Sequence, residues 1–213
     1  MAKFWIADQF AQYLGTAIID LEDSTFNLAL VDSTLASEET AWATATAYTA
    51  GNVRMPTSGN RNGHRYICTV AGTSHATTEP TWPTTDDATV TDGTVTWAEY
   101  GGDLCSLDIW ADASGSEVAN GSGYTTGGET LTTLSLTTTY SDTVWDADDV
   151  TFSSLTKTFR YAFLYMSGTV DGIVNPIVGY ILYDEAFADK SVSGIDWWTQ
   201  ISSSGIYTFD ARA

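Results

Sequence analysis

Few residues of this sequence have the types and spacing that catalysis needs. There are two histidines, His64 and His75, and both lie in segments rich in Gly, Asn and Thr. Ser154-Leu-Thr-Lys157 has the spacing of a serine nucleophile and its lysine, but the companion motifs are absent. The sequence contains no Gly-x-Ser-x-Gly elbow and no HExxH or Cys-x-x-Cys metal motif. We therefore predict a non-enzyme with no catalytic residues and no cofactor; an activity on envelope glycans is a minor alternative.

Four aspartates could in principle hold a metal ion: Asp142, Asp146, Asp148 and Asp149 lie together before an apolar strand pattern. Calcium prefers several carboxylate oxygens on a flexible loop. The spacing does not match an EF-hand, so a solvated acidic turn is the default interpretation. We predict no metal site.

The charge of the chain excludes one class of partner. Its 213 residues include 27 acidic and 8 basic side chains, which gives a net charge of −19. Binding to nucleic acid depends on Lys and Arg that neutralise phosphates, so nucleic acid is not an expected partner. Residues 42–102 hold five of the acids and three of the bases. That segment therefore carries −2, and the 22 acids and 5 bases outside it give −17.

The two cysteines, Cys68 and Cys105, are too few for a secreted disulfide framework. Cys68 lies in an apolar run and is interpreted as a small buried hydrophobe, with a Cys68–Cys105 disulfide as the alternative. The N-terminus lacks the apolar core of a signal peptide, and no apolar run approaches the roughly 20 residues of a membrane span. We expect a soluble protein made in a cytoplasm, without a membrane partner.

Residues 42–102 have the features of a small module placed inside another domain. Trp and Tyr recur through the segment, and strand patterns occupy residues 65–71 and 94–100. An insertion costs its host little when its ends lie close, because loop-closure entropy grows only logarithmically. We predict a discontinuous host domain, residues 1–41 and 103–213, with 42–102 as an inserted small β module.

The host segments predict one helix and many short strands. Apolar residues at three- and four-residue spacing favour a helix over residues 4–14. Alternation and a Thr-rich composition favour strands at residues 26–31, 104–110, 131–136, 150–152, 195–201 and 205–210. The prediction is a mainly β fold: an antiparallel β-sandwich with one short N-terminal helix and a small all-β module inserted in a loop.

Two further segments, residues 158–166 and 177–183, are apolar on both faces. Strands of this kind lie at the centre of a sheet or under a partner subunit. Each large side chain buried there contributes on the order of 1.5–3 kcal/mol. The side chains expected in the core or in an oligomer contact are Phe159, Tyr161, Phe163, Tyr165, Tyr180 and Tyr183.

Outside the insert, several motifs resemble a family of virion structural proteins of tailed bacteriophages. The matching residues are 26–33, 117–131 with its Gly-Tyr-Thr-x-Gly-Gly block, Phe152, 158–165 with its Arg-Tyr-Ala-x-Leu-Tyr strand, 176–180 and 205–206. The part of the chain that carries the resemblance is about two-thirds of the whole. The resemblance implies a β-rich protein carried on the particle, and neither motif marks a catalytic site.

The insert resembles small aromatic modules of phage tail and fibre proteins, and also chitin-binding-type carbohydrate modules. The second resemblance lies in the spacing of Trp42, Tyr48, Gly51-Asn-Val53 and Tyr66, and it departs between residues 54 and 62. Because exposed aromatic rings in such modules stack on sugars, it implies a carbohydrate-binding role. The candidate residues are Trp42, Tyr48, Tyr66, Trp82 and Trp97. For Trp82 and Trp97, a role in the module core is the alternative.

Together these observations predict a non-enzymatic virion structural protein, specifically a capsid decoration (cement) protein on the outer particle surface. The expected partners are the major capsid protein or other virion proteins, and further copies of the chain in a homo-oligomer, with a trimer favoured. The expected location is the virion, assembled in the bacterial host cytoplasm. The alternative is a tail, fibre or head-fibre adhesin whose insert binds host surface polysaccharide.

Overall fold

A computed structural model describes residues 2–139, 142–202 and 204–210. Strands account for 45% and helices for 6% of the structure, so the predicted mainly β class is confirmed. All pairs of named strands are antiparallel. Within the described ranges, no helix is long and apolar enough to cross a membrane.

The centre of the host is a five-stranded sheet with the order β1-β16-β13-β2-β9. Its strands, in that order, are Lys3–Ile6 (β1), Ile177–Leu182 (β16), Tyr161–Met166 (β13), Phe26–Val31 (β2) and Glu129–Thr130 (β9).

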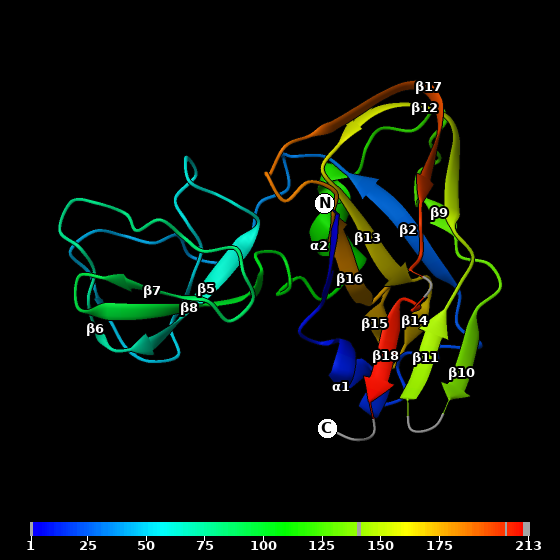
Figure 1. The fold of residues 1–213 in the computed structure, drawn as a ribbon. Coiled ribbons are helices and arrows are strands. Elements are labelled where there is room, and N and C mark those ends of the chain that lie inside the picture. Colours follow the sequence, from blue (N-terminus) through cyan, green and yellow to red (C-terminus); the bar gives the residue numbers. More distant parts are fainter. Residues whose placement is uncertain (1, 140–141, 203, 211–213) are drawn as a thin grey trace.

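Smaller sheets and short helices surround this central sheet (Figure 1). A three-stranded sheet contains Ser135–Thr139 (β10), Asp142–Asp146 (β11) and Tyr207–Asp210 (β18). Two-stranded sheets pair Val150–Phe159 (β12) with Lys190–Thr199 (β17), and Thr169–Val170 (β14) with Ile173–Val174 (β15). The helices are Phe10–Gly15 (α1), Trp110–Ala113 (α2) and the 3-10 turn Ser114–Ser116 (η1).

The central sheet is buried on both faces, as the two-faced apolar patterns predicted for its central strands. Alternate residues of β13 belong to different clusters, because successive side chains of a strand point to opposite faces. Ala162 and Leu164 pack with Phe152 of β12 on one side. Tyr161 and Phe163 pack on the other side with a cluster that includes Trp110 of α2. All six residues of β13 are buried.

The insert forms a separate body beside the host (Figure 1). Its four-stranded sheet has the order β4-β5-β8-β7, and the pair β3-β6 lies next to it. In chain order these strands are Ala47–Tyr48 (β3), Val53–Arg54 (β4), His64–Val70 (β5), Gly72–Thr73 (β6), Thr89–Asp92 (β7) and Val95–Gly102 (β8). Each named sheet takes its strands from the insert or from the host, never from both.

The helix predicted over residues 4–14 is wrong in its first half. Residues 3–6 form β1, which pairs with β16, and only Phe10–Gly15 is helical. The three- and four-residue spacing matches the burial only in part: Phe10 is buried, whereas Ala11 is exposed and the buried Tyr13 lies outside the pattern. It could not show that a neighbouring strand takes up the backbone groups of the first residues.

Three strand predictions also need correction. The strand predicted over residues 131–136 begins only at Ser135, as β10. Residues 104–110 do not form a strand: turns lead into α2, and the carboxylate of Asp112 accepts hydrogen bonds from the backbone N–H groups of Asp108 and Ile109. The predicted strand over 158–166 is two strands, because the chain bends at Arg160 between β12 and β13. Phe159 therefore lies on one side of the central sheet and Tyr161 on the other.

Candidate functional site

The five aromatic residues predicted to bind carbohydrate form the core of the insert. Each of them is at most 7% exposed. The Trp82 ring lies 4.3 Å from the Tyr66 ring, and Trp97 contacts both Tyr48 and Trp82 edge-on. Stacking on a sugar needs an open ring face, and these faces are covered by one another. Between the two roles left open for Trp82 and Trp97, their burial favours the core role.

The buried carboxylate of Asp92 holds two of these aromatic rings in place. Asp92, at the end of β7, accepts hydrogen bonds from the indole N–H groups of Trp42 at 2.7 Å and Trp97 at 3.2 Å. It also accepts one from the backbone N–H of His75 at 2.8 Å. Because a buried indole N–H without an acceptor is costly, Asp92 fixes the position of both rings.

A polar hollow opens on the surface of the insert above this core. Its volume is about 320 Å³, and its lining residues are Asn60, Asn62, Glu79, Pro80, Thr81, Trp82 and Thr84. Glu79 organises the hollow: its carboxylate accepts hydrogen bonds from the Trp82 indole at 2.8 Å and the Asn60 amide at 2.7 Å. The hydroxyl of Thr57 donates to it at 2.5 Å, and the backbone N–H of Thr57 at 2.8 Å.

The other side of the hollow is fixed in the same way. The amide of Asn62 donates to the Tyr66 hydroxyl at 2.8 Å, and that hydroxyl donates to the backbone carbonyl of Pro83 at 2.7 Å. The carbonyl oxygen of Asn62 accepts the backbone N–H of His64. The polar groups of the hollow are thus held in place before any ligand arrives, which lowers the entropy cost of binding.

The electrostatics of the hollow select against anions. Burial alone favours the neutral acid at Glu79, but the hydrogen bonds from Thr57, Trp82 and Asn60 outweigh it and hold the pKa of Glu79 below its usual range. The carboxylate is therefore ionised at neutral pH, and no Lys or Arg lines the hollow to offset it. Amides, hydroxyls and one carboxylate suit a neutral ligand rich in hydroxyl groups.

A second hollow meets the first at Glu79 and Pro80. Its other lining residues are His75, Thr78, Thr91, Asp92 and Gly93. His75 is exposed, and its Nδ1 accepts the backbone N–H groups of Thr77 and Thr78. The two hollows therefore share a wall formed by Glu79 and Pro80.

His64 packs at the boundary between the insert and the host, where its contacts are structural. It is buried, its Nδ1 lies 2.8 Å from a carboxylate oxygen of Glu99, and its ring packs edge-on against Trp5 of β1. Burial opposes the charge of Glu99, but hydrogen bonds from His64 and the Gly101 N–H lower its pKa. Next to this pair, Arg61 forms an ion pair with the buried Asp103.

The remaining candidates for chemistry each have structural partners. Lys157 donates its ammonium proton to the backbone carbonyl of Ala119 at 2.5 Å, and Ser154 is exposed, with its backbone N–H bound to Asp196. Asp148 accepts the hydroxyls of Thr132 and Thr133, and Asp149 accepts the backbone N–H of Ile201. Within residues 2–139, 142–202 and 204–210, no three His, Cys, Asp or Glu side chains are placed to hold a metal ion.

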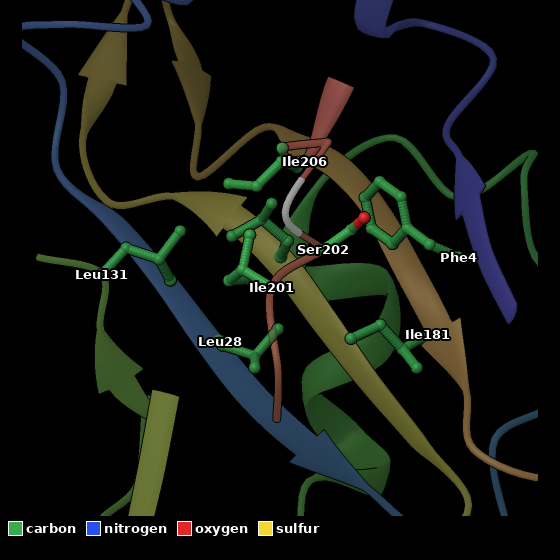
Figure 2. Close-up of a pocket in the computed structure, with 9 residues that line it drawn as sticks. Phe4, Leu28, Leu131, Ile181, Ile201, Ser202 and Ile206 are labelled. Carbon is green, nitrogen blue, oxygen red and sulfur yellow. The ribbon is translucent and has the colours of Figure 1, made fainter. Parts of the chain in front are cut away.

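An apolar cavity of about 120 Å³ lies in the host (Figure 2). Phe4, Leu28, Leu164 and Ile181 point into it from the central sheet, and Leu131 and the segment of Ile201, Ser202, Gly205 and Ile206 close it. This volume is small beside the pockets that hold most ligands. The cavity lacks convergent polar groups and resembles a packing gap under a loop.

Sequence reasoning missed the polar hollow. Its organising carboxylate, Glu79, stands in the printed sequence beside Pro80 and Trp82. The sequence pattern of a Glu three residues before a Trp was only a weak indication of a site, because the other partners of Glu79, Thr57 and Asn60, lie about twenty residues earlier in the chain. Comparisons with protein-family models, curated proteins and solved structures found no match for this chain.

Proposed function

We propose that this protein is a non-enzymatic structural component of a phage virion, and specifically a capsid decoration (cement) protein on the outer surface of the particle. The observation that carries the proposal is the division into two bodies, each with its own sheets and its own hydrophobic cluster. The insert extends away from the host sheets (Figure 1). A host fixed to a shell would therefore present the insert to solvent. The resemblance of the host segments to virion proteins supports the same role.

In this proposal the host binds the major capsid protein or another virion protein and associates with further copies of the chain. Decoration proteins hold a shell together by bridging neighbouring subunits, so their affinity comes from contact area and multivalency. The central sheet, buried on both faces, gives the host a rigid frame for such contacts. The location would be the virion, assembled in the bacterial host cytoplasm.

Cryo-electron microscopy of the particle, with an antibody fragment raised against the insert, tests this role. We expect density of the chain on the head shell, with the fragment bound at the outer end. Labelling on the tail alone, or particles without the chain, would remove the decoration role.

The polar hollow on the insert favours one second candidate, a tail, fibre or head-fibre adhesin that binds host surface polysaccharide. The candidate ligand groups are the amides of Asn60 and Asn62 and the hydroxyls of Thr81 and Thr84. The carboxylate of Glu79 positions Asn60 but already accepts four hydrogen bonds within the insert. This site lies beside the aromatic core and uses at most the edge of Trp82, so it differs from the platform expected from the sequence.

A glycan array with the intact protein separates the two candidates. We expect an adhesin to bind neutral surface glycans, and Thr81→Val or Asn60→Ala to weaken that binding. Asn120→Ala, an exposed change in the host, is the matched control and should leave binding unchanged. Silence across surface glycans counts against the adhesin, and equal loss in the control variant would place binding outside the hollow.

A further inference from the structure

The largest exposed aromatic side chain of the protein lies at the end of β17. Trp198 is 62% exposed, and Ile195 on the same strand is 50% exposed. The adjacent Trp197 points the other way and packs edge-on against Phe159 and Tyr183. One indole of the pair therefore anchors β17 to the host, and the other stands in solvent.

A hollow of about 270 Å³ lies directly beside this exposed indole. Its lining residues are Ala2, Ile181, Tyr183, Trp197, Trp198, Thr199 and Gln200. It runs along β17 and the outer part of β16 and reaches the N-terminal segment before β1. Trp198 forms part of its wall, so the same surface presents both a projecting ring and a recess of a size that can receive one.

The lining contains no charged side chain, although the chain carries a net charge of −19. Two copies that meet on an acidic face would bring like charges together, which is unfavourable. Two copies that meet through this hollow bring no charged lining side chains together, so the repulsion between like charges is reduced there. Three charged residues directly flank the lining segments: Lys3 is paired with Asp86, Asp184 is paired with Lys190, and the exposed Asp196 accepts the backbone N–H of Ser154.

We propose that two copies of this chain associate about a two-fold axis here, with Trp198 of each copy inserted into the hollow of the other. An isologous contact requires one patch that is complementary to itself, and a knob beside its own recess meets that requirement. Buried Trp residues are among the side chains that contribute most to binding at interfaces. This proposal rests on the self-association that is part of the proposed function, and it names the surface through which the copies associate. Because the contact is two-fold symmetric, it predicts a dimer in place of the trimer favoured by the sequence.

Sedimentation velocity of the purified full chain over a range of concentrations tests the contact without any virion, so its failure can be told apart from failure of the decoration role. We expect a species of twice 22.9 kDa. Trp198→Ser should weaken association by at least about 30-fold, the factor that corresponds to a hot-spot residue. Val174→Ser, which removes another half-exposed apolar side chain of the host, is the control and should remain dimeric.

Gln200→Glu is a second variant that changes little in size and places a carboxylate on the wall of the recess. It should also weaken the dimer, and circular dichroism should show the wild-type fold for both variants. A wild-type chain that stays monomeric at all concentrations, a trimer, or a Trp198→Ser protein that associates as tightly as the wild type would each overturn the proposal.

Discussion

Arg65 of the insert binds both carboxylate oxygens of Asp8 in the host, with Nη1–Oδ2 and Nη2–Oδ1 distances of 2.8 and 2.6 Å. The same guanidinium contacts Glu39 at 3.1 Å and donates through Nε to the backbone carbonyl of Tyr100. Arg65 is only 4% exposed, and although burial works against its charge, these partners raise the pKa of the guanidinium. The side chain therefore fixes the insert to the host in one orientation.

Replacement of this side chain should loosen the junction. We expect Arg65→Ala to cost about 1–3 kcal/mol, since it removes charge-assisted hydrogen bonds and leaves Glu39 without its partner. Urea unfolding measures the loss, and hydrogen exchange should rise in β1. The half-exposed pair of Lys190 and Asp184 provides the control, because Lys190→Ala should hardly change the midpoint. Equal effects of the two variants would contradict a special role for Arg65.

Gly102 is a second tie between the two bodies. A Cβ atom at this position would lie 1.9 Å from the Tyr180 hydroxyl oxygen and 2.8 Å from Trp5. Both neighbours are buried, so neither ring can move freely, and Gly102→Ala should cost about 1–3 kcal/mol through overpacking. Gly59→Ala is the matched control, because nothing lies within 4 Å of its added methyl group. Thermal unfolding should separate the two variants by several degrees, and coincident curves would refute the close approach.

Asp92 should be the most sensitive carboxylate of the insert. Asp92→Ala leaves the indole N–H groups of Trp42 and Trp97 without their acceptor in a buried core, which we expect to cost about 3 kcal/mol. Near-ultraviolet circular dichroism should lose part of its tryptophan signal. Asp23→Ala, an exposed change in the host, serves as the control. An unchanged spectrum and melting temperature for Asp92→Ala would show that the indoles find other partners.

Glu79 makes the stability of the insert depend on pH. Its pKa is lower in the folded protein than in the unfolded chain, so the ionised form stabilises the fold. That contribution is present above the unfolded pKa of about 4.3 and is lost as the pH falls through the lower folded value. Glu79→Gln should therefore reduce stability at pH 7 and flatten its decline on acidification.

Thermal unfolding between pH 7 and pH 2.5 checks this prediction. Part of the loss of stability on acidification should remain in Glu79→Gln, because the pKa of Glu99 is also lowered in the folded protein. A variant that loses as much stability as the wild type over this range would remove Glu79 from the explanation.

The two cysteines should be unreactive in the folded protein. Both are buried and free, and burial raises the pKa of Cys68 and brings that of Cys105 to about 12. Since the thiolate is the reactive form, a thiol reagent at pH 8 should label neither residue in the native state and both after denaturation. Rapid native labelling would contradict the burial, and fewer than two labelled thiols in denaturant without reductant would indicate oxidation.

The pattern of residue types was enough to predict the class of the fold and the most deeply buried strands. The two-faced apolar patterns at residues 158–166 and 177–183 predicted central strands, because a strand shows its burial in the alternation of its own side chains. β13 and β16 occupy the centre of the sheet accordingly. The concentration of Trp and Tyr in residues 42–102 predicted an aromatic module, and the structure gives that segment its own cluster.

Which side chains and strands come into contact could not be read from local patterns. Apolar spacing in residues 4–14 fits a helix, yet β16 recruits residues 3–6 as a strand. Trp97 fills a core because Tyr48 packs against it, and Trp82 does so because it packs on Tyr66 and Trp97. The long-range strand pairing of the insert brings these rings together. The ties of Arg65 to Asp8 and of Glu79 to Thr57 join residues far apart in the chain. Local periodicity encodes burial, whereas partners of polar groups depend on the long-range pairing of strands.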